Sequence, residues 1–537
     1  MPARWPDTRF VLPPLLSAVL LVLAQPPFHV LPLAFLALAP MAAGVALLPP
    51  GSGGGSGASL QGLIFGLLFW GFSLMWVPLE VGRHFSWALP GYGVLLILLG
   101  GLSALFAWIL HRLHHGGGMP LALAVPLAWV GVEWIRAHFP MGLAFPWLGL
   151  GVTLTPWPWL LGMAEWAGES GVVFWLACVS GWVAREMVRV GGRGRGRWEG
   201  LRVEESGRRT CSEDAGWGPG PLWGSGRFPV FRVLMVAVLL VPPLLGWMRA
   251  GTLPLQPGPK VVVIGTHVAR ELRSDPMASA REAMAQIRTI LESSWVSPSA
   301  ELILLPEATV PLPLEGDEAA FLREELGLMA ARFGSPLVVG GLGQVPDGDG
   351  AHPPTNSAYL VSPTGEIPQR YDKVRLVPGM EAGRYRSGGG GKTLEYGRWV
   401  FGPLVCYESL FGALARKARR QGAHALLNLT SDIWFGEGDT GLGALFLHQH
   451  PAHLVLRAVE NRMPVARAAN GGFSLILDPL GRVSSQVVPP EGGLVGAQLL
   501  TTPGMTVFTR VGDLVGPASV LLTLLFLVWG RRNNTQR

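Results

Sequence analysis

The chain has 537 residues, of which 49% are hydrophobic and only 15% are charged, and its mean hydropathy is +0.36. Ordinary globular proteins carry about 25% charged residues, so this composition excludes a wholly water-soluble chain and indicates a membrane protein with a soluble part. The net charge of +6 would suit a nucleic-acid partner. However, much of the excess arginine lies in short loops and at the termini, where it more often records membrane orientation. We therefore expect no nucleic-acid partner.

A helix that crosses about 30 Å of hydrocarbon needs about 20 mostly apolar residues. Eight segments come near this length and composition, and they predict about eight spans. They lie at 10–25, 28–48, 60–79, 91–112, 119–137, 166–187, 228–248 and 511–530. The proline- and tryptophan-rich stretch 145–159 is more typical of an interfacial or re-entrant piece.

The distribution of arginine predicts the orientation. Arg4 and Arg9 precede the first apolar segment, which could be a cleaved signal peptide, but its retention accounts better for the charges that follow. Six crossings from a cytoplasmic N-terminus return the chain to the cytoplasm at the arginine-rich loop 188–227, as the positive-inside rule requires. The basic tail at 531–537 is cytoplasmic on the same count. Residues 249–510 then lie on the opposite side of the membrane.

Residues 259–502 have a different character, because short β-branched or aliphatic runs alternate there with amphipathic stretches, as in an α/β domain. The expected strands are 260–264, 301–305, 337–342, 357–362, 399–405, 423–429 and 473–477, and the expected helices are 277–294, 318–333, 410–421 and 451–463. The Gly/Ser run 51–58 and the run 388–391 are expected to be flexible loops. We thus divide the chain into a membrane domain with seven spans at 1–248, an α/β domain at 259–502, and a last span at 511–530.

Three reactive side chains each follow a strand-like run in this α/β domain. Cys406 follows Phe401–Val405, Glu307 follows Leu304-Leu305-Pro306, and Lys373 follows Tyr371-Asp372. A lone cysteine after an apolar strand is most often a small buried hydrophobe. A thiol, a carboxylate that can act as its base, and an amine that can offset an oxyanion together favour covalent catalysis instead.

These pieces resemble the Glu-Lys-Cys triad of the carbon–nitrogen hydrolase, or nitrilase, superfamily. A nitrilase-like α/β/β/α sandwich inserted before the last of about eight spans resembles the apolipoprotein N-acyltransferase family. The matching segments are Trp129–Arg136, Phe145-Pro146-Trp147, Leu376–Glu381, Cys406-Tyr407-Glu408 and Asn428–Gly436. The chain departs from the family pattern at Ser274, Arg375, Gly379-Met380 and Ser431.

The resemblance implies a bacterial inner-membrane acyltransferase that works in two steps. A phospholipid would donate an acyl chain to Cys406 as a thioester. The α-amino group of a diacylglyceryl-cysteine, at the N-terminus of a lipoprotein, would then accept it. The implied catalytic residues are Glu307, Lys373 and Cys406, and the implied supporting or substrate-binding residues are Glu381, Tyr407, Glu408, Trp434, Phe435 and Trp147. The implied protein is a monomer without a cofactor, with a periplasmic catalytic domain and cytoplasmic termini.

Two other functions remain open from the residues. A membrane-tethered amidase or nitrilase would use the same triad with water as the acceptor. A transporter is suggested by Glu133 and Arg136, which are costly in a membrane helix and are expected to pair with each other or with a headgroup.

Several other charged or polar residues are expected to have no catalytic role. His448, His450 and His453 suggest a metal site, but the triad needs no metal, so none is expected. Glu165 and Glu169 are expected to lie in water near the membrane boundary.

Overall fold

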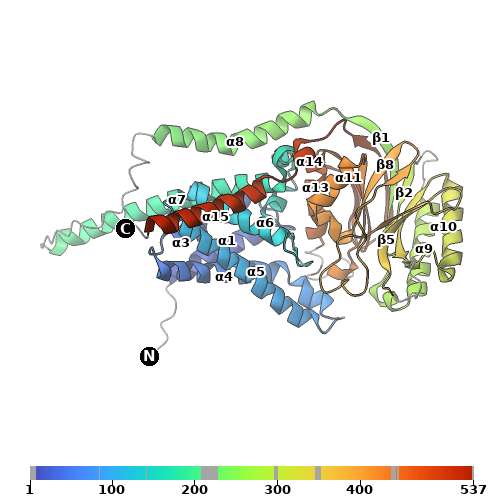
Figure 1. Cartoon of the computed structure of the whole chain (residues 1–537), viewed down its shortest axis with the longest axis horizontal. Coiled ribbons are helices and arrows are strands. Elements are labelled where there is room, and N and C mark those ends of the chain that lie inside the picture. The colour runs from blue at the N-terminus through green and yellow to red at the C-terminus, as the bar shows by residue number, and fades with distance from the viewer. Residues whose placement is uncertain are drawn as a thin grey trace.

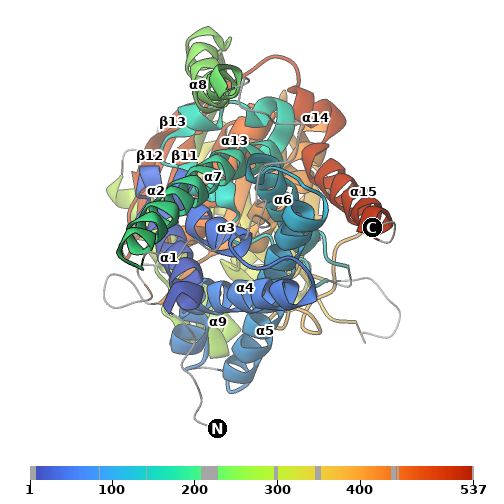
Figure 2. The same ribbon diagram turned by 90° about the vertical axis from the view of Figure 1, so that its left-hand side faces the viewer.

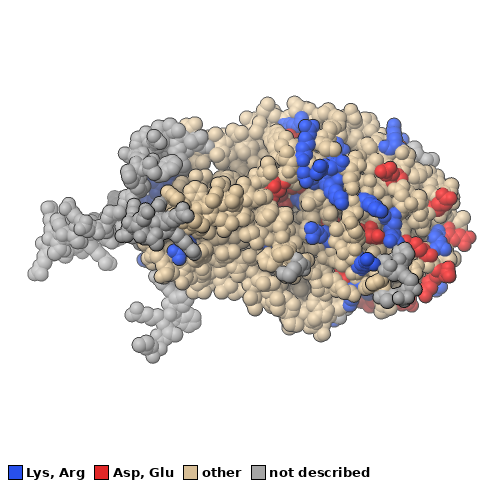
Figure 3. Space-filling model, viewed as in Figure 1, with Lys and Arg blue, Asp and Glu red and all other residues tan. Residues whose placement is uncertain are grey.

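The computed structural model describes residues 8–534 except 84, 141, 207–227, 295–299, 345–351, 437–442 and 444–446. It has an apolar helical bundle at one end and an α/β domain at the other (Figure 1). Figure 3 shows that acidic and basic side chains gather over the α/β domain and are sparse on the visible face of the bundle. This separation suits a bundle that a bilayer surrounds, because charged side chains are costly in hydrocarbon.

All eight expected spans fall on helices. These are α1 (Thr8–Ala24), the pair α2 (Leu31–Leu36) and α3 (Ala39–Ala46), α4 (Ser52–Ser73), α5 (Ala88–His111), α6 (Leu121–Ala137), α7 (Ala164–Ser206), α8 (Phe228–Thr252) and α15 (Val515–Asn534). Among the described residues, four helical stretches are long and apolar enough to cross a membrane by themselves: Ser52–Ser73, Ala88–Gly116, Ala164–Gly191 and Met235–Thr252. The count of eight spans therefore stays a prediction.

Helix α8 lies along the outside of the bundle (Figures 1 and 2). In its most apolar 18-residue stretch only 6% of the residues are buried, whereas 61% are buried in the corresponding stretch of α7. An apolar helix this exposed needs a covering of lipid or protein.

The prediction of a flexible loop at 51–58 is wrong, because α4 begins at Ser52 and the rest of this segment is helical. The glycines of α4 allow its backbone to approach α5 closely. A Cβ added at Gly62 would lie 2.3 Å from the carbonyl oxygen of Ser103, and one at Gly66 would lie 2.6 Å from the Ser103 Cβ. Small residues at a helix–helix contact are typical of membrane bundles, where close backbone packing replaces the hydrophobic effect.

The α/β domain contains two sheets that face each other. The first has the order β13-β1-β2-β4-β5-β6, with β3 paired to β4, and the second has the order β12-β11-β10-β9-β8-β7. The strands of the first sheet are β1 (Gln256–Gly265), β2 (Leu302–Leu304), β3 (Val310–Pro313), β4 (Leu337–Gly343), β5 (Thr355–Val361), β6 (Gln369–Asp372) and β13 (Gly493–Thr501). Those of the second are β7 (Leu394–Tyr396), β8 (Trp399–Val405), β9 (Ala425–Ser431), β10 (Val465–Asn470), β11 (Ser474–Leu477) and β12 (Val483–Val487).

Helices cover the outer face of each sheet and complete the four-layer sandwich. Helices α9 (Pro276–Ser293) and α10 (Ala320–Phe333) pack on the first sheet through one apolar core. Helices α11 (Gly412–Arg420) and α13 (Gln449–Asn461) pack on the second sheet and share a core with the membrane bundle. Figure 1 shows this second helical layer facing the bundle, so the second sheet is the one nearer the membrane half.

Every strand and helix expected in 259–502 is present with small shifts in its bounds, while β3, β6, β7, β10, β12 and β13 had not been expected. The chain enters the domain from α8 and leaves it through α14 (Val507–Val511). Helix α15 then runs back along the bundle (Figure 1). Strands β1 and β13 therefore pair antiparallel beside the entrance and the exit.

The α4–α5 contact gives a first prediction. Gly62→Ala places a methyl group against the α5 backbone, and such overpacking costs about 1–3 kcal/mol. We expect a lower thermal unfolding midpoint in detergent, followed by tryptophan fluorescence. Gly101→Ala is the matched control, because a Cβ there meets nothing within 4 Å. Equal midpoints for the two variants would contradict close packing at Gly62.

Candidate active site

The ends of three strands bring the expected reactive side chains together. Glu307 lies after β2, Lys373 directly follows β6, and Cys406 directly follows β8, so both sheets contribute. Glu307 is 7% exposed and Lys373 is fully buried, whereas Cys406 is partly accessible. A buried ion network thus lies behind a cysteine that a substrate can reach.

Lys373 is held between two carboxylates. Its Nζ lies 3.2 Å from Oε1 of Glu307 and 2.8 Å from Oε1 of Glu381. Burial alone would lower the pKa of this ammonium, but the charges of Glu307 and Glu381 outweigh burial and hold the pKa well above its usual value. Lys373 is therefore a fixed positive charge at neutral pH.

The two carboxylates are themselves fixed by amide donors. The side-chain amide of Asn356 donates to Glu307 at 2.8 Å and to Glu381 at 3.0 Å. The backbone N–H of Ser431 donates to Oε2 of Glu307 at 2.9 Å, and that of Val377 donates to Oε2 of Glu381 at 2.8 Å. Asn356 was not expected as a site residue; its place in the polar run Thr355-Asn356-Ser357 at the start of β5 was the only signal for it.

Cys406 stands at the turn from β8 into the 3-10 helix η9 (Cys406–Leu410), with a φ of +50°. Non-glycine residues rarely adopt this left-handed conformation, and sharp strand-to-helix turns of this kind present nucleophiles in other enzymes. Burial, together with the charge of Glu307, raises the pKa of the Cys406 thiol above its ordinary value, while Lys373 opposes this shift. The thiol is therefore protonated at rest and needs a base.

Glu408 holds the cysteine turn from behind. Its carboxylate accepts hydrogen bonds from the hydroxyl of Tyr371 at 2.8 Å and from the backbone N–H groups of Val374 at 2.6 Å, Arg375 at 3.1 Å and Val405 at 2.7 Å. Burial raises the pKa of Glu408, partly offset by these donors. The fully buried Glu408 thus ties the segment after Lys373 to the segment that carries Cys406.

His450, Asp432 and Arg467 form a second buried network beside the cysteine. The Nε2 of His450 lies 3.1 Å from the carbonyl oxygen of Cys406, and its Nδ1 lies 2.8 Å from Oδ1 of Asp432. Asp432 also pairs with Arg467. Burial would raise the pKa of Asp432, but Arg467 and His450 lower it to about 2. The sequence had suggested His450 only as a metal ligand.

The three histidines have different neighbours, although the rings of His450 and His453 lie 5.8 and 5.9 Å from the Trp147 ring, between centroids. His450 is held by Asp432, and the ring of His448 lies 4.7 Å from that of Phe473, between centroids. Within the described ranges no group of three or more His, Cys, Asp or Glu residues could hold a metal ion.

The expected aromatic residues fall into two places. The Trp147 indole is buried, donates to Oε1 of Gln449 at 2.9 Å, and lies 5.9 Å from the Phe435 ring, between centroids. The hydroxyl of Tyr407 donates to the carbonyl of Ala144 at 2.9 Å. These three side chains therefore join the bundle to the α/β domain, whereas Trp434 is partly exposed.

Glu133 and Arg136 attract each other and also have neutral hydrogen-bond partners. Glu133 accepts from the indole N–H of Trp129 at 2.8 Å, and Arg136 donates to the carbonyls of Phe145 and Trp147. Arg136 thus fixes the loop that carries Trp147, and a headgroup contact stays a prediction.

The expectation of a wet environment is wrong for Glu165, whereas Glu169 is partly exposed. Glu165 is buried and pairs with Arg249 at 3.0 Å and with Arg462 at 2.7 Å. Glu169 pairs with Arg457 at 2.8 Å. Arg457 and Arg462 come from α13 and its C-terminal end, so these carboxylates bind the two domains together, which their position in the sequence could not reveal.

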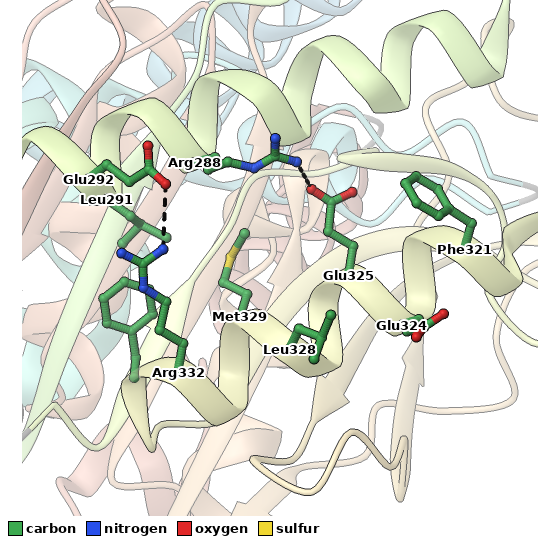
Figure 4. Close-up of a pocket in the computed structure, with 10 residues that line it drawn as sticks. Arg288, Leu291, Glu292, Phe321, Glu324, Glu325, Leu328, Met329 and Arg332 are labelled. Carbon is green, nitrogen blue, oxygen red and sulfur yellow. Dashed lines mark hydrogen bonds and ion pairs between the residues drawn. The ribbon is translucent and has the colours of Figure 1, made fainter.

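A pocket on the outer helical layer holds none of these residues. It lies between α9 and α10, where Arg288 pairs with Glu325 and Arg332 pairs with Glu292 at 3.4 Å (Figure 4). The candidate active site is therefore the one at the strand ends.

Comparisons with known proteins match both halves. Residues 17–182 match the family model "Apolipoprotein N-acyltransferase N-terminal domain", and residues 274–499 match "Carbon-nitrogen hydrolase". The chain is 28% identical to a Geobacter metallireducens protein named apolipoprotein N-acyltransferase, with 95% of this chain and 94% of that protein covered. A Pseudomonas aeruginosa protein of the same name is 26% identical, with 97% and 96% covered.

Solved structures align with about half of the chain. Saccharomyces cerevisiae Nit3, a nitrilase-superfamily member, is 20% identical over 46% of this chain and 92% of its own, with a TM-score of 0.35. An amidase from Nesterenkonia sp. is 22% identical over 49% of this chain and 96% of its own, also with a TM-score of 0.35.

The network around Asp432 gives a second prediction. Asp432→Asn leaves Arg467 buried without its carboxylate, which costs about 3–5 kcal/mol, and we expect a strongly lowered unfolding midpoint in detergent. Glu292→Gln, in the exposed pair with Arg332, is the control and should cost at most about 1 kcal/mol.

The pH dependence follows from the low pKa of Asp432. Its folded pKa, about 2, lies below the unfolded value of about 3.9, so its stabilisation is complete above about pH 4 and is lost as the pH falls through 2. The Asn variant should lack this part of the acid destabilisation. An identical acid profile in both proteins would contradict a charged Asp432.

Proposed function

Because the chain belongs to the apolipoprotein N-acyltransferase family, we propose that it moves an acyl chain from a phospholipid, through a thioester on Cys406, to a lipoprotein. The acceptor is the N-terminal α-amino group of a diacylglyceryl-cysteine. The observation that carries the proposal is the buried Glu307–Lys373–Glu381 network beside a partly accessible cysteine.

In the first step Glu307 acts as the general base. It takes the thiol proton of Cys406 as the sulfur attacks the ester carbonyl, so the thiol need not ionise beforehand. The ammonium of Lys373 and the backbone N–H of Tyr407, at the start of η9, offset the charge on the carbonyl oxygen. The intermediate collapses to the thioester, and Glu307 returns the proton to the departing oxygen of the lysophospholipid.

In the second step the amine attacks the thioester. Glu307 accepts a proton from the amine, the amide bond forms, the carbon–sulfur bond breaks, and the proton returns to Cys406. Glu381 contributes by position, because it is a second carboxylate that holds the ammonium of Lys373. The thioester must also be kept from water, or the acyl chain would be lost as a free fatty acid.

A position at the bilayer surface suits both substrates. Withdrawal of acyl chains into water costs roughly 0.8 kcal/mol per CH₂ group, and a site seated on a membrane bundle avoids most of this cost. The apolar helices and the relatives agree with a bacterial membrane protein. We extend this to eight spans in the inner membrane, cytoplasmic termini, a cytoplasmic loop at 188–227, and a monomer whose α/β domain is periplasmic and binds no nucleic acid.

Thioester formation gives a third prediction. The purified protein, incubated with phosphatidylethanolamine labelled in its acyl chain, should acquire a label that hydroxylamine removes. Cys406→Ala should abolish the label, and Glu307→Gln or Lys373→Met should slow its appearance by about 10²–10³, the usual effect of losing a base or an oxyanion partner. A Cys178→Ala variant should label normally, because Cys178 is buried in α7.

The acceptor separates the proposal from its rivals. Addition of a synthetic diacylglyceryl-cysteine peptide should move the label into an amide that hydroxylamine does not cleave. Release of labelled fatty acid alone would instead support a hydrolase. An unlabelled wild-type protein, under conditions in which a family enzyme labels, would refute the thioester mechanism.

The orientation gives a fourth prediction. In a background with Cys178, Cys211 and Cys406 replaced by serine, Glu324→Cys on the exposed face of α10 should react with a membrane-impermeant maleimide in intact spheroplasts. Arg197→Cys, in the loop 188–227, should react only after the membrane is opened. The reverse pattern would invert the proposed topology.

A further inference from the structure

Arg273 lies beside the candidate base but has no part in the mechanism above. It belongs to the 3-10 helix η7 (Arg270–Ser274) and donates from Nη2 to the hydroxyl of Ser431. The backbone N–H of the same Ser431 donates to Oε2 of Glu307 at 2.9 Å. One residue therefore connects the guanidinium to the base of the proposed reaction.

The guanidinium of Arg273 has N–H donors beyond the one that binds Ser431. Its central carbon lies 4.8 Å from the centroid of the Trp434 ring, which fixes its plane. In the described part of the chain, no protein acceptor is hydrogen-bonded to Nε or Nη1 of Arg273, and the side chain is partly exposed. Arginine presents its donors as a rigid fork that matches phosphate oxygens.

The surroundings of Arg273 are aromatic and reach into the membrane half. The Trp434 ring lies 6.1 Å from the ring of Phe85, which lies 5.7 Å from that of Trp87, between centroids. Phe85 and Trp87 precede α5, and Trp87 is 40% exposed. Aromatic rings of this kind favour the boundary between hydrocarbon and water, where phospholipid headgroups lie.

Charges of both signs surround Arg273. The Arg384 guanidinium carbon lies 5.3 Å from the centroid of the Phe85 ring, and Arg270 is buried and donates to the backbone carbonyls of Glu80 and Ile433. The nearby carboxylates are Glu307, whose charge acts on Arg273, and Glu80. Glu307 pairs with Lys373 and Glu80 pairs with Arg83, so each carboxylate has another cation and the positive charge of Arg273 can act on a further anion.

We propose that Arg273 binds the phosphate of the phospholipid donor, so that the enzyme selects acyl esters that carry a phosphate a few bonds from the carbonyl. The inference rests on the proposed function, since it names the group by which the same site recognises its donor. With the phosphate on Arg273, the hydrocarbon chains lie along the aromatic rings toward the bundle and the ester reaches Cys406.

The test compares two acyl donors on the full-length protein in detergent micelles. One is phosphatidylethanolamine, and the other is p-nitrophenyl palmitate, an activated ester without a phosphate. Arg273→Ala should lower kcat/KM for Cys406 acylation by phosphatidylethanolamine by roughly 10- to 100-fold, the usual effect of losing hydrogen bonds to a charged group. Acylation by p-nitrophenyl palmitate should change less than about twofold. Arg273→Lys should recover only part of the loss, because lysine keeps the charge without the fork.

Arg281→Ala is the matched control, because Arg281 is an exposed arginine on α9 of the same domain, and it should leave both donors unaffected. An equal loss of Arg273→Ala activity with both donors would overturn the inference in favour of an effect on Glu307 or Cys406. No loss with either donor would also overturn it. So would normal acylation with slow transfer to the peptide, since that outcome assigns Arg273 to the acceptor. A wild-type protein that forms no thioester from any donor would instead refute the proposed function.

Discussion

The buried ammonium of Lys373 is the charge on which the site depends. Two carboxylates held close together, one buried and one largely buried, would repel each other without a cation between them. Lys373 is in turn buried only because Glu307 and Glu381 offset its desolvation. Burial of any one of these charges without the others would cost free energy. The carboxylates must therefore be held in place, and Asn356 and two backbone N–H groups do so through hydrogen bonds.

The site is also held from the membrane side. The turn that carries Cys406 lies in the same layer as α11 and α13, and Tyr407 reaches the loop that Arg136 fixes in the bundle. Trp434 from the α/β domain also contacts Phe85 from the membrane half. Both domains therefore contribute to the position of the turn that carries Cys406.

The sequence was most informative where chemistry and periodicity coincide. Glu307 and Cys406 could be found because each follows an apolar run, and Lys373 because the ordered set of three resembles a known triad. Asn356 and His450 were missed as site residues, because a polar residue at a strand start and a histidine on a buried helix have many ordinary explanations. The Gly/Ser run 51–58, which lies almost wholly in α4, was misread because glycine favours loops in water, whereas in a membrane bundle it allows helices to pack closely. The ion pairs of Glu165 and Glu169 with α13 and its C-terminal end were missed, because Arg462 and Arg457 lie almost 300 residues away in sequence.

The ion pairs between α7 and α13 constrain how the protein is made. Synthesis begins at the N-terminus, so Glu165 and Glu169 enter the bundle long before Arg462 and Arg457 exist. Until then Glu165 can pair with Arg249, which is synthesised earlier than Arg462. Glu169 can pair with Arg457 only after the α/β domain has been synthesised. Carboxylates near hydrocarbon are unfavourable without a partner. The bundle is thus an incomplete folding unit during biosynthesis, and its ion pairs with α13 form only after the α/β domain has folded and docked.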